Sequence, residues 1–199
     1  MNNNLIYCTP DAPIGGREIT TKVVCVTGMP GSGKEEFVKV AEDLGFDVVR
    51  MGDIVREEAR KRGLSPSDVS VGGLANEERE KNGMGIWATR TIPRITGQRV
   101  VIDGIRGIAE IKVFGEAFSS DMFVVAIDAS SDVRYERIGR RGRKDATLTR
   151  ERFDERDERE KRWGIEQAME EADHVIMNEG TLEEYHQAVR KVLEDLTGM

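Results

Sequence analysis

The sequence predicts an α/β domain built on a parallel sheet with helices on both faces. From residue 22 onward, short runs of β-branched and apolar residues alternate with segments of helical periodicity, which indicates parallel strands joined by right-handed crossovers. The apolar runs do not alternate with polar residues, as expected for strands covered on both sides. The chain has 199 residues, of which 38% are hydrophobic, and this suits one domain with its own core.

Five segments carry the strand pattern. Residues 1–21 precede the first of them, show no periodicity and are expected to form a mobile extension, so that the domain spans residues 22–199. The fourth segment is the most apolar run of the chain. The predicted strands are Lys22–Thr27, Phe46–Val49, Arg99–Asp103, Met122–Ile127 and His174–Met177.

Helices are expected between these strands. A helix follows the first strand, and the next helix is expected to begin with Asp53 as its N-cap and to end at Gly63. The chain then stays polar and helical to about residue 95, with a break at two glycines. We interpret residues 53–95 as a helical insert over one end of the sheet.

The second half of the chain predicts further helices. A Thr181 to Glu184 capping box opens the last one. Its inward residues are expected to be Leu182, Tyr185, Val189, Val192 and Leu196. Residues 134–162 are rich in both acidic and basic side chains. The later part of this segment is typical of an exposed helix with ion pairs between residues four positions apart. The earlier part, residues 137–144, has few acidic residues and indicates a polyanion beneath it.

Composition narrows the possible functions. A net charge of -7 argues against a general nucleic-acid surface. No apolar run approaches the ~20 residues of a membrane span, and the N-terminus lacks a signal-peptide pattern, so we expect a cytoplasmic protein. The two cysteines indicate neither a disulfide framework nor a metal cluster, and Cys25 is expected to be a small core residue. The oligomeric state stays open.

A glycine-rich loop between the first strand and the first helix is the main functional motif. Backbone N–H groups of such a loop converge on phosphate oxygens, the helix N-terminus favours an anion, and the lysine reaches the terminal phosphates. Glu35 stands where the general motif has a hydroxyl residue that binds Mg²⁺. The loop, which we call the P-loop, comprises Gly28, Met29, Pro30, Gly31, Ser32, Gly33 and Lys34.

Other rim residues fit phosphoryl transfer. Asp103 ends a strand expected beside the P-loop strand and could bind Mg²⁺ through water. Arg56 and Arg106 follow strand ends and could hold an acceptor phosphate in bidentate fashion. Arg90 and Trp87 are candidates for the acceptor pocket, although Trp87 equally suits a core anchor of the insert.

These motifs, in this order, resemble those of adenylate kinases and related nucleoside monophosphate kinases. The segments that carry the resemblance are 28–34, 52–56, 103–106 and 137–141, whereas residues 172–181 look more like the end of dephospho-coenzyme A kinases. Over residues 22–198 the chain most resembles a group of archaeal, adenylate-kinase-related ATP-binding proteins. The resemblance implies a P-loop nucleoside triphosphate hydrolase fold of nucleotide-kinase type, with a short lid at about residues 141–148.

The resemblance also implies roles for individual residues. Arg56 and Arg106 would contact the acceptor phosphate, and Arg137 would pack on the base of the donor. The loop that contains Asn178 and Gly180 would border the adenine. In adenylate kinases glycine and threonine follow the P-loop lysine, so Glu35 and Glu36 put the rate of catalysis in question. The residues expected to stabilise the phosphoryl group in the closed lid are Arg141, Arg143 and Arg156.

We therefore expect an enzyme that binds ATP with Mg²⁺ and transfers the γ-phosphoryl group to a small acceptor, with a nucleoside monophosphate as the first choice. A reaction like that of dephospho-coenzyme A kinases is an alternative, which residues 172–181 suggest. A nucleotide-dependent switch with little kinase activity is another, which Glu35, Glu36 and the long polar helices suggest.

Overall fold

The computed structural model describes residues 21–65, 67–140 and 149–198 and contains one five-stranded sheet. All strand pairs are parallel and the order is β2-β3-β1-β4-β5. This confirms the predicted α/β class. The expected N-terminal extension (all but residue 21) and the expected lid, residues 141–148, lie outside the described residues. The strands are β1 (Lys22–Thr27), β2 (Asp47–Arg50), β3 (Arg99–Asp103), β4 (Met122–Asp128) and β5 (His174–Met177).

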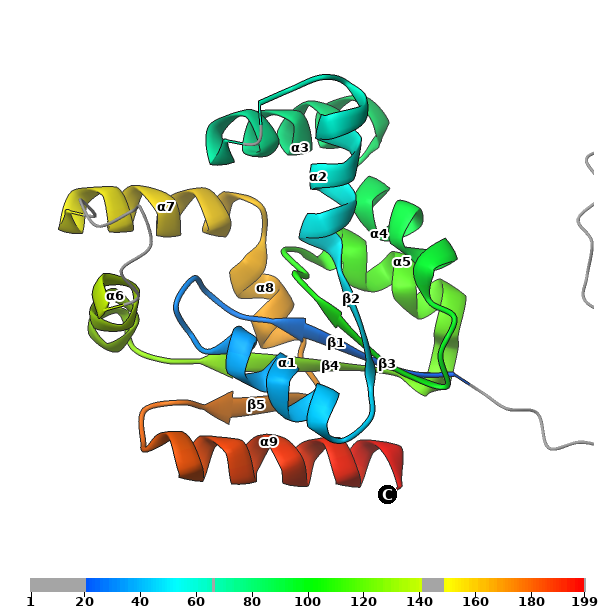
Figure 1. Cartoon of the computed structure of the whole chain (residues 1–199), viewed down its shortest axis with the longest axis vertical. Coiled ribbons are helices and arrows are strands. Elements are labelled where there is room, and N and C mark those ends of the chain that lie inside the picture. The colour runs from blue at the N-terminus through cyan, green and yellow to red at the C-terminus, as the bar shows by residue number, and fades with distance from the viewer. Residues whose placement is uncertain (1–20, 66, 141–148, 199) are drawn as a thin grey trace, which may run out of the picture.

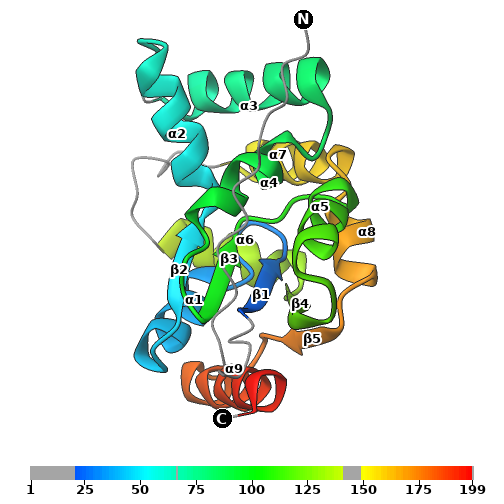
Figure 2. The ribbon, with the colours of Figure 1, turned by 90° about the vertical axis from the view of Figure 1, so that its right-hand side faces the viewer.

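Helices cover both faces of the sheet (Figures 1 and 2). Helices α1 (Lys34–Asp43) and α9 (Leu182–Thr197) share one core with the sheet, and α5 (Ile108–Phe118) packs in the core of the opposite face, where α8 (Ile165–Glu170) also contacts the sheet. Val24 and Val26 of β1 point into the first core, whereas Val23 and Cys25 point into the second. Burial on both sides explains why β1 is apolar throughout.

The chain between β2 and β3 is helical and extends beyond the sheet (Figure 1). Trp87 lies fully buried in this part, and its indole N–H donates to the Ala75 carbonyl oxygen at 3.2 Å. Trp87 is therefore a core anchor and not part of a pocket wall. The elements are α2 (Met51–Lys61), α3 (Asp68–Asn82), α4 (Ile86–Thr91) and the 3₁₀ turn η1 (Ile92–Arg94).

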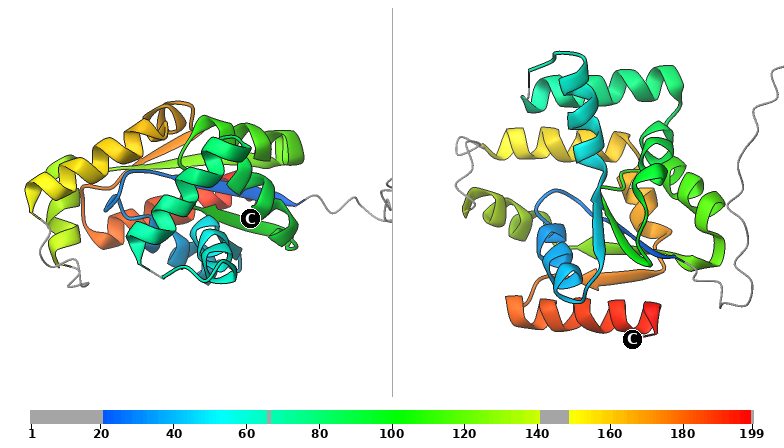
Figure 3. Two further views of the ribbon diagram at one scale, coloured as in Figure 1. Left: turned by 90° about the horizontal axis from the view of Figure 1, so that it is seen from above. Right: turned by 45° about the vertical axis from the view of Figure 1, so that its right-hand side comes forward.

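Two helices follow β4 and lie near its carboxyl end, α6 (Ser131–Arg140) and α7 (Arg150–Arg162) (Figure 3). A 3₁₀ turn, η2 (Ser119–Asp121), precedes β4. The prediction of an exposed, ion-paired helix for α7 is wrong for one face. Phe153, Asp157 and Glu160 are buried on it, because the two carboxylates pair with arginines of other elements.

Two local predictions also need correction. Helix α2 begins at Met51, directly after β2, with Arg50 at the N-cap, so Asp53 lies inside its first turn. Met51 is buried in the core, and this favours a helix that begins earlier in the chain than predicted. Leu182 is 57% exposed, because it is the first residue of α9 and the helix reaches the core only from Tyr185 onward.

The strand register brings five chain segments to one edge of the sheet. Arg50 of β2 pairs with Asp103 of β3, and Val26 of β1 pairs with the same aspartate. Asp128 of β4 pairs with Met177 of β5. The loops after all five strands therefore begin at the same edge, where ligands of parallel α/β sheets bind. Within the described part of the chain, no helix is long and apolar enough to cross a membrane.

Candidate functional site

A pocket of about 340 Å³ opens at this edge, beside the P-loop. It is lined by the P-loop, the ends of β2 and β3, the loop after β3, and helices α7 and α8. Among the residues that the structure describes, four cationic and three acidic ones line it. The charged lining residues are Lys34, Arg50, Arg106 and Arg156 together with Glu35, Asp103 and Glu160.

Three glycines of the P-loop have backbone conformations that other residues rarely adopt. Gly28, Gly31 and Gly33 have φ angles of +142°, +83° and +114°. A Cβ atom on Gly28 would lie 2.3 Å from the Ile127 carbonyl oxygen, and one on Gly33 would lie 2.2 Å from the side-chain nitrogen of Asn178. The glycines are therefore needed both for the turn and for the close packing around it.

Side chains from other elements hold the P-loop in shape. The Asn178 amide donates to the Ser32 carbonyl oxygen at 2.7 Å, and the Tyr185 hydroxyl donates to that of Gly33 at 3.1 Å. Arg134 of α6 donates to the Pro30 carbonyl oxygen at 3.1 Å. These bonds fix the loop before any ligand binds, and such preorganisation favours phosphate binding.

Lys34 is the first residue of α1 and folds back over the loop. Its ammonium group donates to the carbonyl oxygens of Gly28 and, at 3.1 Å, Met29. Burial lowers the pKa of Lys34 to about 8, a change that nearby Asp103 opposes. The lysine thus carries its charge at neutral pH and lies at the N-terminus of α1, where an anion is favoured.

Asp103 lies at the end of β3, next to the P-loop strand as predicted. Its Oδ1 atom is buried and has no hydrogen-bond partner among the residues that the structure describes, and the same holds for the Ser32 hydroxyl in the P-loop. Burial raises the pKa of Asp103, and the charges of Lys34 and Arg50 oppose this change. An unpartnered carboxylate oxygen beside a phosphate-binding loop fits a hard cation such as Mg²⁺.

The two glutamates after Lys34 differ in position. Glu35 lines the pocket, whereas Glu36 is directed toward Lys39 and His186. The Glu36 carboxylate accepts from Lys39 at 2.6 Å and lies 3.2 Å from His186 Nε2 of α9. The bond from Lys39 is the main cause that lowers the pKa of Glu36. Of these two glutamates, Glu35 is therefore the one that adds negative charge to the pocket.

Two groups of comparisons identify the family. The chain is 47% identical over 174 residues to a UPF0200 protein of Thermoplasma acidophilum, which covers 87% of this chain and 96% of that protein. It is 44% identical over 180 residues to a UPF0200 protein of Methanoculleus marisnigri, and this match covers 89% of this chain and 98% of that protein. A family model described as an AAA domain matches residues 27–154. The chain belongs to the UPF0200 family and, more widely, to this AAA-domain family.

Solved structures with the same fold include small-molecule kinases. A gluconokinase from Sinorhizobium meliloti matches with a TM-score of 0.60 at 17% identity, over 92% of this chain and 96% of that one. A shikimate kinase from Acinetobacter baumannii matches with a TM-score of 0.56 at 16% identity, over 90% and 94%. At these identities the likeness concerns the fold, and it confirms the predicted P-loop kinase-type architecture for this UPF0200 protein.

Among the predicted site residues, the fold brings Arg106 and Arg156 to the pocket with Lys34, Glu35 and Asp103. Sequence reasoning missed two charged lining residues of the UPF0200 protein, Arg50 and Glu160. Arg50 ends a strand, so the rule that pointed to Asp103 could have found it. Glu160 gave no local signal, because its partner Arg106 lies 54 residues away in the chain.

The structure places Arg56 and Arg90 elsewhere. Arg56 is exposed and donates to Asp53, three residues earlier on α2, at 2.6 Å. Arg90 pairs with the buried carboxylate of Glu78 and stacks on the Trp87 ring at 4.9 Å. Neither belongs to the pocket lining, because helical partners in the insert engage both side chains.

The remaining predicted residues lie around the P-loop or outside the described chain. Arg137 donates to the Asn178 side-chain oxygen at 3.2 Å, so both residues lie against the loop at Ser32. Gly180 is exposed in the turn before α9. Arg141 and Arg143, the expected lid arginines, lie outside the described residues.

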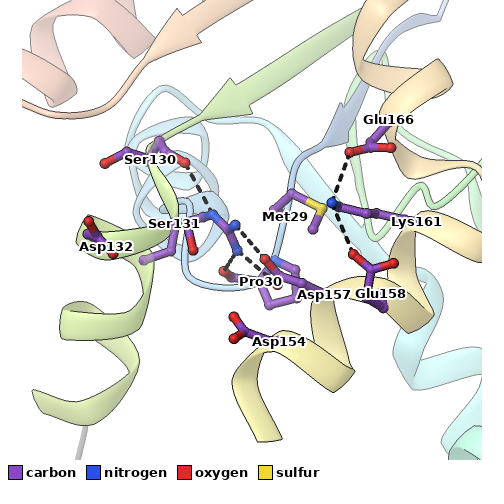
Figure 4. A network of polar contacts seen from close by, with 12 residues as sticks. Met29, Pro30, Ser130, Ser131, Asp132, Asp154, Asp157, Glu158, Lys161 and Glu166 are labelled. Carbon is purple, nitrogen blue, oxygen red and sulfur yellow. Dashed lines mark hydrogen bonds and ion pairs between the residues drawn. The ribbon is translucent and has the colours of Figure 1, made fainter. Parts of the chain in front are cut away.

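A second pocket, of about 550 Å³, includes Met29 of the P-loop in its lining and is rich in carboxylates. Figure 4 shows Lys161 between Glu158 and Glu166, near Met29 of the P-loop. The Lys161 ammonium nitrogen lies 3.2 Å from a carboxylate oxygen of Glu158 and 3.4 Å from one of Glu166. This pocket is larger but contains neither Lys34 nor Asp103. The first pocket is therefore the candidate phosphate site.

Proposed function

We propose that this UPF0200 protein is an ATP-dependent phosphotransferase that acts on a small acceptor. The observation that carries the proposal is the convergence of Lys34, Arg106 and Arg156 on one pocket at the P-loop, together with the buried Asp103 oxygen that has no partner among the described residues. Phosphoryl transfer needs mainly positioning and positive charge around the transferred group, and the pocket provides both. We also propose a cytoplasmic location, where ATP would be available as the donor.

Each group has a proposed part in the reaction. The P-loop N–H groups and Lys34 would bind the β- and γ-phosphates, for which Lys34 would exchange its loop carbonyl partners. Asp103 would hold Mg²⁺ through water, and this ion would supply charge neutralisation on the phosphates. Arg156 would stabilise the phosphoryl group. Arg106 would hold an anionic group of the acceptor.

The transfer itself needs no covalent intermediate on the protein. An oxygen of the acceptor attacks the γ-phosphorus, the bond from phosphorus to the bridging oxygen breaks, and ADP leaves with the electron pair. A hydroxyl acceptor releases its proton to solvent, whereas a phosphate acceptor is already ionised. Closure over the pocket would exclude water and so limit hydrolysis of ATP.

The first acceptor to test is a nucleoside monophosphate. A second candidate function is a nucleotide-dependent switch with slow transfer, and the carboxylate of Glu35 in the pocket favours it, because this charge opposes the phosphates. A protein that binds ATP tightly but phosphorylates no acceptor would support the switch.

The test is transfer of labelled γ-phosphate from ATP, with Mg²⁺, to a panel of nucleoside monophosphates, deoxynucleoside monophosphates, dephospho-coenzyme A and small hydroxy acids. We expect one acceptor class to be labelled rapidly, and Lys34→Ala to abolish the labelling without loss of the fold. Equal labelling by the Lys34→Ala variant would overturn the proposed mechanism.

A further inference from the structure

Arg106 of the pocket is held by Glu160 of helix α7. We infer that Glu160 of α7 and Trp163, the residue that directly follows this helix, are positioning residues that hold Arg106, so that Arg106 and Arg156 are both placed by α7. The inference rests on the proposed function, because it assigns Arg106 to the acceptor and Arg156 to the phosphoryl group.

Glu160 holds Arg106 from one side. One terminal nitrogen of the Arg106 guanidinium, Nη1, donates to both carboxylate oxygens of Glu160. The Glu160 side chain is only 4% exposed, whereas that of Arg106 is 39% exposed and lines the pocket. Removing the partner of a buried carboxylate is costly, so the pair is not expected to separate when a ligand binds. Glu160 therefore fixes one end of the guanidinium and leaves its exposed part to the pocket.

Trp163 and Glu110 fix Arg106 from two further directions. The guanidinium of Arg106 lies over the Trp163 ring at 5.0 Å, and that of Arg79 from α3 lies 5.2 Å from the same ring. The backbone N–H of Arg106 donates to Glu110 of α5 at 2.7 Å, and Arg79 donates to the same carboxylate at 3.1 Å. Backbone and side chain of Arg106 are thus both held before an acceptor arrives.

Helix α7 also carries another arginine of the pocket, Arg156. Arg156 and Glu160 are four residues apart, so they lie on the same face of α7 one turn from each other, and both line the pocket. A displacement of α7 therefore moves Arg156 and, through Glu160, Arg106. Arg56 lacks such a support, since its partner Asp53 is exposed on the same helix.

Glu160→Gln tests the inference, with Glu158→Gln as the matched control. Glu158 lies on the same helix, is exposed and is directed to the other pocket. We expect Glu160→Gln to raise the KM for the acceptor about tenfold, as for loss of one charge-assisted hydrogen bond, with the KM for ATP unchanged. The double variant Glu160→Gln with Arg106→Gln should have the same KM for the acceptor as Arg106→Gln alone. Additive losses, or equal changes in both KM values, would overturn the inference.

A spectroscopic measurement separates this inference from the proposed function. In protein labelled with 5-fluorotryptophan, the ¹⁹F resonance of Trp163 is assigned by its loss in Trp163→Phe. We expect Glu160→Gln to shift this resonance without any ligand, because Arg106 loses its fixed place over the ring, and Glu158→Gln to leave it unchanged. An unshifted resonance in folded Glu160→Gln protein would refute the positioning role, even in a protein that transfers no phosphate.

Discussion

At the scale of single residues, the acidic residue after the P-loop lysine distinguishes this site from the general motif. The sequence placed two carboxylates after Lys34, and both could have faced the nucleotide. The structure separates them, because Lys39 and His186 engage Glu36 while Glu35 lines the pocket. The sequence alone could not show this difference, since His186 lies 150 residues away in the chain.

This difference predicts different results for two similar substitutions. Glu35→Gln should strengthen the binding of ATP several-fold, because it removes a negative charge from the pocket proposed for the phosphates. Glu36→Gln should leave the affinity within about twofold, because that carboxylate is directed to α9. Isothermal titration with a non-hydrolysable ATP analogue measures both. A weaker affinity of Glu35→Gln would show instead that this carboxylate helps to hold the ligand or its metal ion.

The low pKa of Lys34 predicts a pH dependence of ATP binding. Lys34 is protonated below its pKa of about 8 and loses its charge as the pH rises through that value. Affinity should therefore be level from pH 6.5 to 7.5 and fall roughly tenfold by pH 9. Lys34→Arg is the control, because an arginine keeps its charge and should remove the alkaline decline. A similar decline in Lys34→Arg would assign it to another group.

At the scale of elements, α7 is the part of the structure that the sequence described least well. Its dense charges indicated an exposed helix, but Asp157 is buried and forms a two-point ion pair with Arg134 of α6. Arg134 also donates to the P-loop, so this pair connects α7 to the phosphate site. Phe153, Asp157 and Glu160 are spaced so that they lie on one face of the helix. Because two of the three are acidic, the sequence does not indicate that this face is buried.

Burial of this pair predicts a large loss of stability when it is broken. Asp157→Asn should lower the free energy of unfolding by about 3–5 kcal/mol, because it leaves the Arg134 charge buried without its counter-charge. Asp132→Asn breaks the exposed pair with Arg150 and should cost less than ~1 kcal/mol. Urea denaturation of the two variants measures the difference. Similar losses in both would contradict the structural role of the Arg134 to Asp157 pair.

At the scale of the whole molecule, the fold followed from patterns that each strand and helix carries locally. All five strands, the capping box of α9 and the position of Asp103 beside β1 were predicted and are confirmed. In the pocket lining, Asp103 was predicted from its strand end, whereas Arg50 was missed although it also ends a strand, and Glu160 was missed because its partner is distant in the chain. Glu160 meets Arg106 only through the packing of α7, and Arg90 is engaged by Glu78 of α3 instead of the pocket.

A ligand that binds between the P-loop, β3 and α7 should stabilise the whole domain. ATP with Mg²⁺ at about 100 times its Kd should add ~2.7 kcal/mol and raise the Tm by roughly 5–10 °C. Thermal unfolding with and without nucleotide measures this shift, and Lys34→Ala should show little of it. An equal shift in that variant would place the nucleotide outside the P-loop.

We propose that the P-loop and Asp103 form one site for ATP and Mg²⁺. Calorimetric titration of a non-hydrolysable ATP analogue, with and without Mg²⁺, into the natural protein and Asp103→Asn tests it most directly. We predict that Mg²⁺ strengthens binding to the natural protein at least tenfold and that Asp103→Asn loses most of this gain while it still binds the metal-free nucleotide. The same gain from Mg²⁺ in both proteins would contradict the account.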